Sequence, residues 1–292
     1  MTEDADPLRA ALADRTLQLA VLLDALGERD RQDAAQREWD FALQLQTGNL
    51  PNEFPAFPDR PEFDIRGGMV TAFQVGGDVY DFYFNDDRRL AFVVADASGK
   101  GLPAAIFITR MRTILRAASR RIGDPAQCLT LLNEVLCFDN PDLMFVTAFY
   151  GILDTATGEV VFANAGHNPP VHVKPDGSAE PVRHVRAPIL DAVNGIAYRT
   201  GTLMLAPGDT LCCFSDGVTE AHDPDKALFG DPRLLAALAS NAGADLAAME
   251  AAVIGEVDRF IGSAPIADDL TLLLLRWNGI PELRHDRPGR SV

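Results

Sequence analysis

Aspartates recur in this sequence at the ends of apolar, strand-like runs. Five of them stand beside a glycine or a turn: Asp78, Asp96, Asp216, Asp268 and Asp269. One acid at such a place is ordinarily a turn former, but a folded sheet can bring several strand ends into one cluster. Clustered carboxylates repel one another, so they require raised pKa values or bound cations. An all-oxygen ligand set without histidine or thiolate favours Mg²⁺ or Mn²⁺ over Zn²⁺.

Two further motifs carry polar side chains that suit a substrate site. In VVADASGKGLPAA, Lys100 lies between Gly99 and Gly101, directly before a proline and a helical pattern. The glycines permit a tight turn, and the amides at the start of a helix favour an anion or a metal-bound water. The sequence leaves Lys100 open between a phosphate contact and a solvated loop lysine. In NAGHNPP, His167 and Asn168 either lie beside the substrate or satisfy a tight turn.

Composition excludes several classes of protein. The chain has 292 residues, 47% of them hydrophobic, which suits a folded protein with a sizeable core. Its 42 acidic and 26 basic residues give a net charge of -16, which disfavours a nucleic-acid partner. No apolar run reaches the roughly 18 residues of a membrane span, and the N-terminus lacks a signal-peptide pattern. Because the four cysteines form no C-x-x-C pair, we expect reduced, structural cysteines and a cytoplasmic location.

The chain divides by pattern into four segments. Over residues 1–50 we expect a helical, coiled-coil-like segment that regulates and dimerises the protein. Its seam has leucines at alternating spacings of about three and four, at Leu8, Leu12, Leu19, Leu22 and Leu26. A proline-rich stretch over 51–61 is either a linker or an extended wrap, 62–278 is a folded domain, and 279–292 is a disordered tail.

The domain over 62–278 consists mainly of short strand-like runs. Helical patterns begin at Pro103 and after Asp124, and a third, near residues 232–262, is broken at Gly243. Runs of strands and runs of helices, without strict alternation, predict an α+β fold with antiparallel sheet.

Several blocks occur in an order typical of one family. VGGDVYDFY, VVADASGKGLPAAIF, NAGHNPPV, LAPGDTLCCFSDGVTEA and ADDLTLLLL follow one another over roughly Trp39 to Trp277. In this the chain resembles the metal-dependent serine phosphatases of the SpoIIE/RsbU branch, relatives of the type 2C (PPM) protein phosphatases. The resemblance implies an antiparallel β-sandwich flanked by helices, preceded here by the helical extension. It also implies two divalent cations, Mn²⁺ or Mg²⁺.

The resemblance assigns roles residue by residue. It makes Asp96 a bridge between two metal ions, with the carbonyl of Ala97 as a second contact. Asp216 and Asp268 become ligands of one metal, and Asp269 shares or exchanges that duty. Asp78 is expected to hold a metal or its water, with Asp81 behind it.

Function follows from the same resemblance. We expect hydrolysis of phosphoserine or phosphothreonine on a protein, and within this branch the substrate is a STAS-type antagonist of an anti-sigma factor in a partner-switching pathway. A P-loop nucleotidase fails because Val94 stands where the first glycine belongs. A two-carboxylate glycosidase is also possible, but such an enzyme would remain active in the presence of a chelator, whereas a metal-dependent phosphatase would not. A non-enzymatic, partner-binding relative remains the alternative, although such a relative normally lacks a ligand acid.

Overall fold

A computed structural model describes residues 36–280 except 45, 47, 49, 139 and 184–186. The chain separates into two units, Met1–Leu45 and Gln46–Val292. In the first unit residues 36–44 are helical, whereas the predicted leucine seam lies outside the described residues, as does the tail from residue 281. None of the described helices is long and apolar enough to cross a membrane.

The second unit contains two five-stranded sheets, and every pairing within them is antiparallel. Sheet A has the order β1-β10-β9-β6-β7, and sheet B has the order β2-β3-β4-β5-β8. The strands of sheet A are β1 Phe63–Val70, β10 Leu270–Trp277, β9 Thr210–Phe214, β6 Val171–Val173 and β7 Ala179–Pro181. Those of sheet B are β2 Asp78–Phe84, β3 Arg89–Ala97, β4 Val146–Asp154, β5 Glu159–Ala165 and β8 Gly201–Met204.

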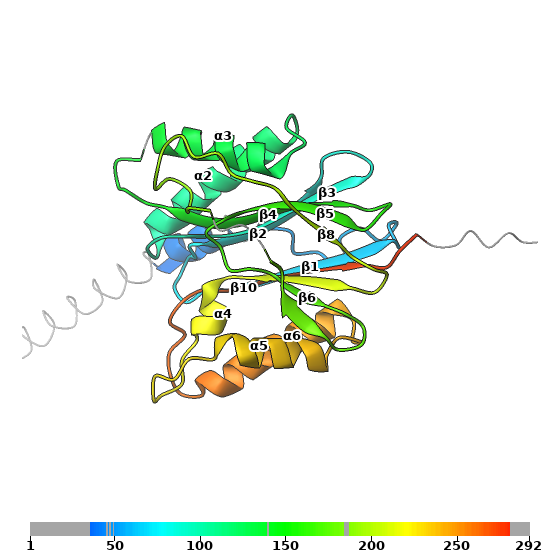
Figure 1. Ribbon diagram of the computed structural model, residues 1–292. Helices are drawn as coiled ribbons and strands as arrows, with labels where there is room; N and C mark the ends of the chain where they lie inside the picture. The colour runs from blue at the N-terminus through cyan, green and yellow to red at the C-terminus, as the bar shows by residue number, and fades with distance from the viewer. Residues whose placement is uncertain are drawn as a thin grey trace, which may run out of the picture. The chain divides into compact units, whose positions relative to one another are not determined.

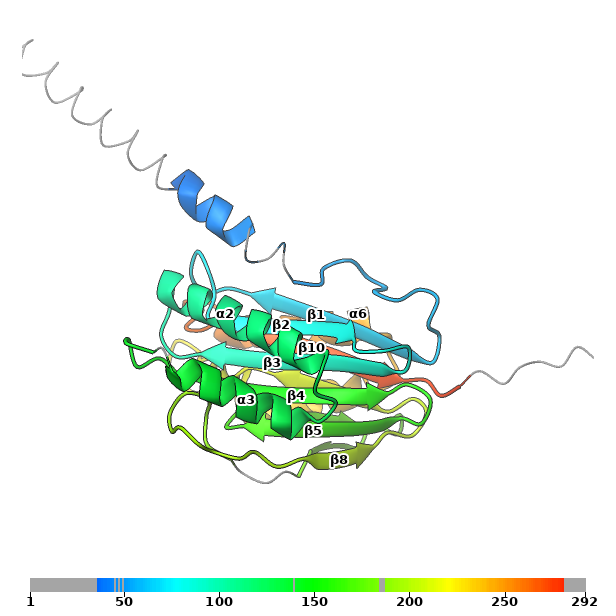
Figure 2. The ribbon, with the colours of Figure 1, turned by 90° about the horizontal axis from the view of Figure 1, so that it is seen from above.

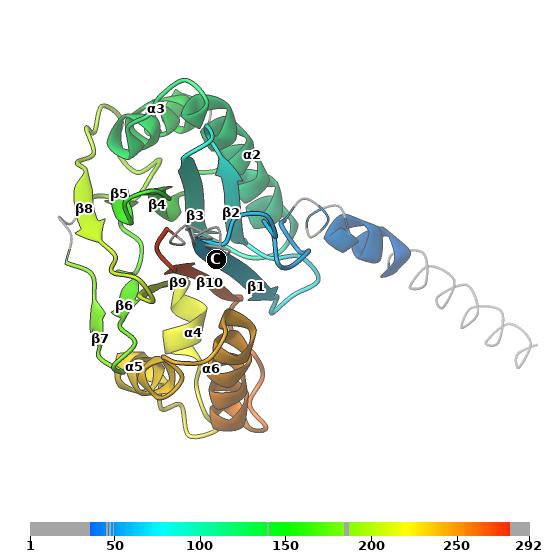
Figure 3. The same ribbon diagram turned by 90° about the vertical axis from the view of Figure 1, so that its right-hand side faces the viewer.

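Helices cover the outer face of each sheet, which gives four layers (Figures 1 and 3). The helices on sheet B are α2 Leu102–Ser119 and α3 Pro125–Phe138, and Figure 2 shows them running over β2 to β5. Those on sheet A are α4 Asp216–Glu220, α5 Gly230–Ser240 and α6 Leu246–Ile261. The predicted helix starts are confirmed: α2 has its proline in the first turn, and Asp124 accepts a hydrogen bond from the backbone of Gln127 at the start of α3.

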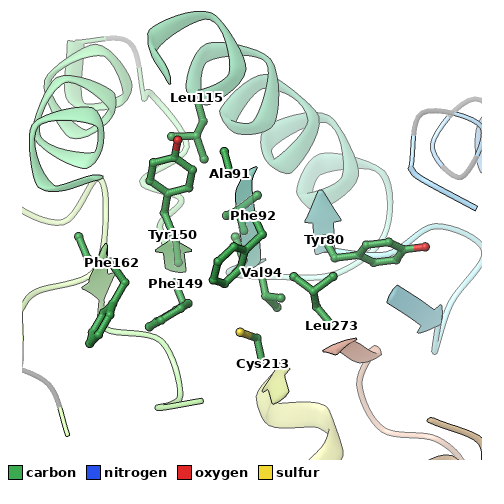
Figure 4. Packing of buried hydrophobic residues seen from close by; sticks show 14 of the residues in the cluster. Tyr80, Ala91, Phe92, Val94, Leu115, Phe149, Tyr150, Phe162, Cys213 and Leu273 are labelled. Carbon is green, nitrogen blue, oxygen red and sulfur yellow. The ribbon is translucent and has the colours of Figure 1, made fainter. Parts of the chain in front are cut away.

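Alternation along the strands sorts the core into an inter-sheet layer and a layer under the helices. Phe92 and Phe149 of sheet B point toward Cys213 of sheet A, whereas Tyr150 points toward α2 (Figure 4). The adjacent cysteines show this alternation, since Cys213 belongs to the inter-sheet core and Cys212 to the core under α4, α5 and α6. Strand β9 therefore forms a wall shared by two hydrophobic cores.

Two glycines make room for aromatic rings in the inter-sheet layer. Gly151 is the register partner of Phe92, and a Cβ on it would lie 2.4 Å from the ring. Gly201 stands in the same relation to Phe162, at 2.6 Å. The rings can lie flat across the neighbouring strand because these positions carry no side chain.

Residues 51–61, for which the sequence leaves open a linker or an extended wrap, lie against the sandwich. The ring of Phe57 is 5.0 Å from that of Phe84 and 5.9 Å from that of Phe82. Tyr80 donates a hydrogen bond to the carbonyl of Pro51 at 2.8 Å. The segment thus covers part of the apolar surface of β2.

Candidate active site

Three polar side chains form a row across sheet B at one end of the sandwich. Asp78 on β2 is the register partner of Asp96 on β3, and Asp96 is the register partner of Thr147 on β4. Directly opposed residues share a face of the sheet. For this row it is the face toward sheet A, because Thr271 of β10 donates a hydrogen bond to Asp78 at 2.5 Å.

The two opposed aspartates are close enough for their charges to repel each other. Asp78 is buried, and burial together with the charge of Asp96 raises its pKa well above the usual range. Burial also raises the pKa of Asp96, to about 7, with further contributions from Asp216, Asp268 and Asp269. These carboxyls therefore lie close enough to feel one another's charge, as the sequence predicts for a cluster that holds cations.

Asp216 and Asp268 lie next to strands β9 and β10 of sheet A, and a glycine brings them together. Asp216 begins α4, separated from β9 only by Ser215, and Gly217 follows it. A Cβ on Gly217 would lie 2.1 Å from the carbonyl oxygen of Asp269, so only glycine lets the start of α4 approach this chain segment. Burial, followed by the charges of Glu220 and Asp268, raises the pKa of Asp216.

Ser215 fastens the end of β9 to the start of β10. Its hydroxyl donates to the carbonyl of Asp269 at 3.1 Å and accepts from the backbone N–H of Thr271, also at 3.1 Å. Its own backbone N–H donates to the carbonyl of Thr271. The segment that carries the two adjacent aspartates is thereby held beside α4.

Asp269 braces the loop that precedes Asp78. One carboxylate oxygen accepts from the N–H of Ala72 at 2.8 Å, and the other from the N–H of Gly77 at 2.7 Å. A Cβ on Gly76 would lie 2.6 Å from the second oxygen. Burial raises the pKa of Asp269, against the effect of these backbone donors. The glycine pair before Asp78 therefore lets the loop close on a buried carboxylate.

The turn between β3 and α2 lies against the same loop. Ala97 donates its N–H to the carbonyl of Gly77 at 3.0 Å, and a Cβ on Gly77 would lie 3.1 Å from the carbonyl oxygen of Ala97. Gly99 and Gly101 have φ values of 86° and 71°, a region that favours glycine. They turn the chain sharply before α2 and place Lys100 at the tip.

Lys100 is paired with a site aspartate. Its ammonium lies 2.9 Å from a carboxylate oxygen of Asp268, and it also donates to the carbonyl of Ala267. The same group lies 5.5 Å from the centre of the Phe73 ring. The lysine thus contacts the acidic cluster itself, and its contact with a phosphate stays a prediction.

The NAGHNPP motif forms a tight turn next to the row. Asn164 donates to the carbonyl of His167 and accepts from its N–H, at 3.0 and 2.8 Å. The His167 ring is buried, its Nδ1 lies 2.8 Å from the hydroxyl of Thr147, and burial lowers its pKa to about 4. Asn168 is half-buried. A neutral imidazole thus positions the threonine opposite Asp96.

Asp81 does not lie behind Asp78, and that expectation is wrong. Its carboxylate is fully buried on the other face of β2, where it is 2.8 Å from Arg112 and 2.7 Å from Arg116 of α2. The physical reason is the alternation of side chains along a strand, which puts residues three apart on opposite faces. Asp81 anchors a helix and is not part of the acidic cluster.

The chemistry of the donor set fits hard divalent cations. The cluster offers carboxylate, carbonyl and hydroxyl oxygens, and the mutual repulsion of its acids is relieved by positive charge. Among the residues that the structure describes, no three acidic, histidine or cysteine side chains are spaced so that they could hold a metal ion together. Asp268 is held by Lys100 and Asp269 by backbone amides.

Comparison with known proteins places this geometry in a family. A family model described as Stage II sporulation protein E (SpoIIE) matches residues 86–278, more than half of the chain. The chain belongs to the SpoIIE family. The matched region includes Asp96, Asp216 and Asp268, whereas Asp78 lies just before it.

Two relatives are similar to this chain over most of its length. The chain is 28% identical to Protein IcfG of Synechocystis sp., over 82% of this chain and 42% of IcfG. It is 27% identical to phosphoserine phosphatase RsbU of Bacillus subtilis, over 66% of this chain and 57% of RsbU. The chain thus spans about half the length of these relatives.

Solved structures confirm the predicted fold. The SiaA-PP2C domain of Pseudomonas aeruginosa superposes with a TM-score of 0.74 at 23% identity, covering 84% of this chain and 98% of that chain. The RsbU and RsbW domains of Rv1364c from Mycobacterium tuberculosis give 0.65 at 27% identity, covering 75% and 61%. Two antiparallel sheets flanked by helices therefore form a PP2C-like fold, as expected for the SpoIIE family.

Several residues that build this SpoIIE-family site were missed by sequence reasoning. Thr147, Ser215 and Thr271 carry the hydrogen bonds that orient the acids or their backbone. The sequence offered a local signal for two of them, because Ser215 directly precedes Asp216 and Thr271 follows Asp269 by two residues. For Thr147 no local signal exists, since only the register of β3 with β4 places it opposite Asp96.

Proposed function

We propose that this chain is a metal-dependent protein phosphatase that hydrolyses phosphoserine or phosphothreonine. The observation that carries the proposal is the opposed pair Asp78 and Asp96, with Asp216 and Asp268 within electrostatic reach of Asp96. Support comes from the SpoIIE family match and from RsbU, a relative named as a phosphoserine phosphatase.

In this proposal Asp96, the carbonyl of Ala97, Asp216 and Asp268 would hold two divalent cations, Mn²⁺ or Mg²⁺. When bound, such cations supply an activated water and neutralise charge on the phosphoryl group. Asp78 would complete the site from β2, oriented by the hydroxyl of Thr271.

The other predicted site residues would have supporting roles around these ligands. Asp269 would stabilise the cluster from behind, since both of its oxygens already hold the loop before Asp78. His167, as a neutral imidazole, would fix Thr147 and would not exchange protons near neutral pH. Substrate contacts by Lys100 and Asn168 remain predictions.

The substrate proposed is a small STAS-type antagonist of an anti-sigma factor, within a partner-switching pathway. This rests on the likeness of the chain to the RsbU branch. A cytoplasmic location is part of the same proposal.

The activity is tested by hydrolysis of p-nitrophenyl phosphate and of phosphoserine, phosphothreonine and phosphotyrosine peptides, each with Mn²⁺, Mg²⁺ or EDTA. We expect turnover with either metal and none in EDTA. The phosphoserine and phosphothreonine peptides should be preferred over the phosphotyrosine peptide. Equal rates with Mn²⁺, Mg²⁺ and EDTA would contradict the proposal. No turnover at all, despite tight metal binding, would favour the non-enzymatic, partner-binding alternative.

A further inference from the structure

The ammonium group of Lys100 makes three contacts at the edge of the acidic cluster. It pairs with the carboxylate of Asp268 at 2.9 Å, donates to the carbonyl of Ala267 and lies 5.5 Å from the ring of Phe73. The contacts combine an anion, a backbone dipole and an aromatic face, each of which attracts a cation.

The position of the lysine is set by the backbone and not by chance contact. Gly99 and Gly101, on either side of it, both have positive φ, which bends the chain so that Lys100 reaches from the start of α2 to the start of β10. Lys100 and its partner Asp268 are far apart in the sequence, so their contact forms only when the two sheets have packed together.

The Lys100–Asp268 pair lies beside carboxylates that repel one another. Asp268 is adjacent to the braced Asp269 in sequence, and both contribute to the repulsion at Asp96. The salt bridge from Lys100 reaches one of these site carboxylates, Asp268. The lysine thus neutralises part of the cluster without any bound ion.

We infer that Lys100 is an internal counter-ion that competes with divalent cations for Asp268. The inference rests on the proposed function, because it takes Asp268 to be a metal ligand. A carboxylate that coordinates a divalent cation cannot keep an ammonium at 2.9 Å without strong repulsion between the two positive charges. Lys100 therefore leaves Asp268 when the metal binds, and its charge lowers the affinity of the site for metal.

The size of the effect follows from exposure. The side chains of Lys100 and Asp268 are 44% and 45% exposed, so solvent screens the pair and its net strength is that of a surface salt bridge. The competition is accordingly modest. Removing the charge of Lys100 should tighten metal binding by roughly 1.5- to 5-fold, and not by orders of magnitude.

The test is a Mn²⁺ titration of the chelator-stripped full chain by calorimetry, on wild type, K100M and K100R. The matched control is K174M, since Lys174 is also 44% exposed and pairs with an acid, Glu180, away from the site. We expect tighter Mn²⁺ binding in K100M, near-wild-type binding in K100R and no change in K174M. We also expect a lower melting temperature for metal-free K100M, because the cluster then lacks its counter-ion.

A second measurement uses the wild type alone. An amine-reactive label, read by mass spectrometry, should modify Lys100 faster when Mg²⁺ is present, with Lys174 as internal reference. Unchanged or weaker Mn²⁺ binding in K100M overturns the inference, as does labelling of Lys100 that Mg²⁺ leaves unaltered. A wild-type chain that binds no divalent cation at all is a different result, since it removes the proposed metal site together with this inference.

Discussion

Asp78 and Asp96 lie directly opposite each other on β2 and β3, on the face of sheet B that meets sheet A. Opposed like charges destabilise a strand pair, and burial adds to the cost. The sandwich therefore holds at its end an arrangement that is unfavourable without a cation.

The metal-free protein should lose stability as pH rises from about 6.5 to 8.5. Because the pKa of Asp96 is raised to about 7 in the folded state, this carboxyl loses its proton as the pH rises through this range. In the unfolded state the carboxyl is already ionised over the whole range, so the stabilisation provided by the bound proton is lost. His167 acts in the opposite sense only between its lowered pKa of about 4 and its unfolded value of 6.5, outside the window. Thermal melts in EDTA measure the slope, and a flat or rising melting temperature contradicts the coupling.

Replacing Asp96 with Asn should abolish divalent binding while the fold survives. The substitution keeps the shape of the side chain and removes one charge of the repelling pair, so the metal-free melting temperature should rise and its pH slope should shrink. Calorimetric Mn²⁺ titration and thermal melts measure both effects. Asp176→Asn, at an exposed turn, is the control and should leave Mn²⁺ affinity alone. Near-native turnover and metal dependence in Asp96→Asn would show that this residue is not a bridge.

Gly217→Ala should destabilise the protein by about 1–3 kcal/mol and weaken metal binding. The added methyl would lie 2.1 Å from the backbone oxygen of Asp269, so the start of α4 must move away from β10 and carry Asp216 with it. Gly255→Ala, in α6 with open space around its Cα, should instead stabilise by up to about 1 kcal/mol. Urea unfolding of both variants provides the comparison, and equal stabilities would contradict the close approach.

Asp81→Ala should cost about 3–5 kcal/mol, because it leaves Arg112 and Arg116 facing a buried position without their carboxylate. Glu256→Ala removes an exposed pair on α6 and should cost less than about 1 kcal/mol. Because Asp81 lies on the face of β2 away from the cluster, the folded fraction of Asp81→Ala should keep its Mn²⁺ affinity. A loss of affinity without a loss of stability would return Asp81 to the site.

Deleting residues 1–32 should convert a dimer into a monomer and change the phosphatase rate without abolishing metal binding. The leucine seam predicts a helix that needs an apolar partner, since an isolated helix of this size is marginal in water. Light scattering of the full chain and the deletion variant measures the mass. A monomeric full chain at tens of micromolar ends the dimer prediction and leaves docking on the chain itself.

Local patterns predicted the parts of the site that depend on neighbours in sequence. The aspartates at strand ends, the glycines before Asp78 and the proline start of α2 all follow from turn and capping chemistry. Alternation would also have placed Asp81 correctly, had it been applied to β2. Some short elements escaped, namely β7, β8 and α4, because their few residues establish no period and carry no apolar run.

Relationships between distant segments could not be predicted from the sequence. The register that opposes Asp96 to Thr147 is set by packing across the whole sheet, and one residue of slip would turn the acid away. The contact of Gly217 with Asp269 joins two strand ends about fifty residues apart and depends on both strands being in place. The same holds for Lys100, whose partner is known only once the sandwich has closed.

Among the strands that the structure describes, β10 comes last along the chain, yet it lies between β1 and β9 in sheet A. It brings Thr271 to Asp78, and the residues just before it bring Asp269 to the loop that precedes Asp78. During synthesis the chain emerges from its N-terminus, and this strand leaves the ribosome after every other one. An incomplete translation product therefore contains most of the acids but not the strand that gathers them, so activity begins only when synthesis of the domain is finished.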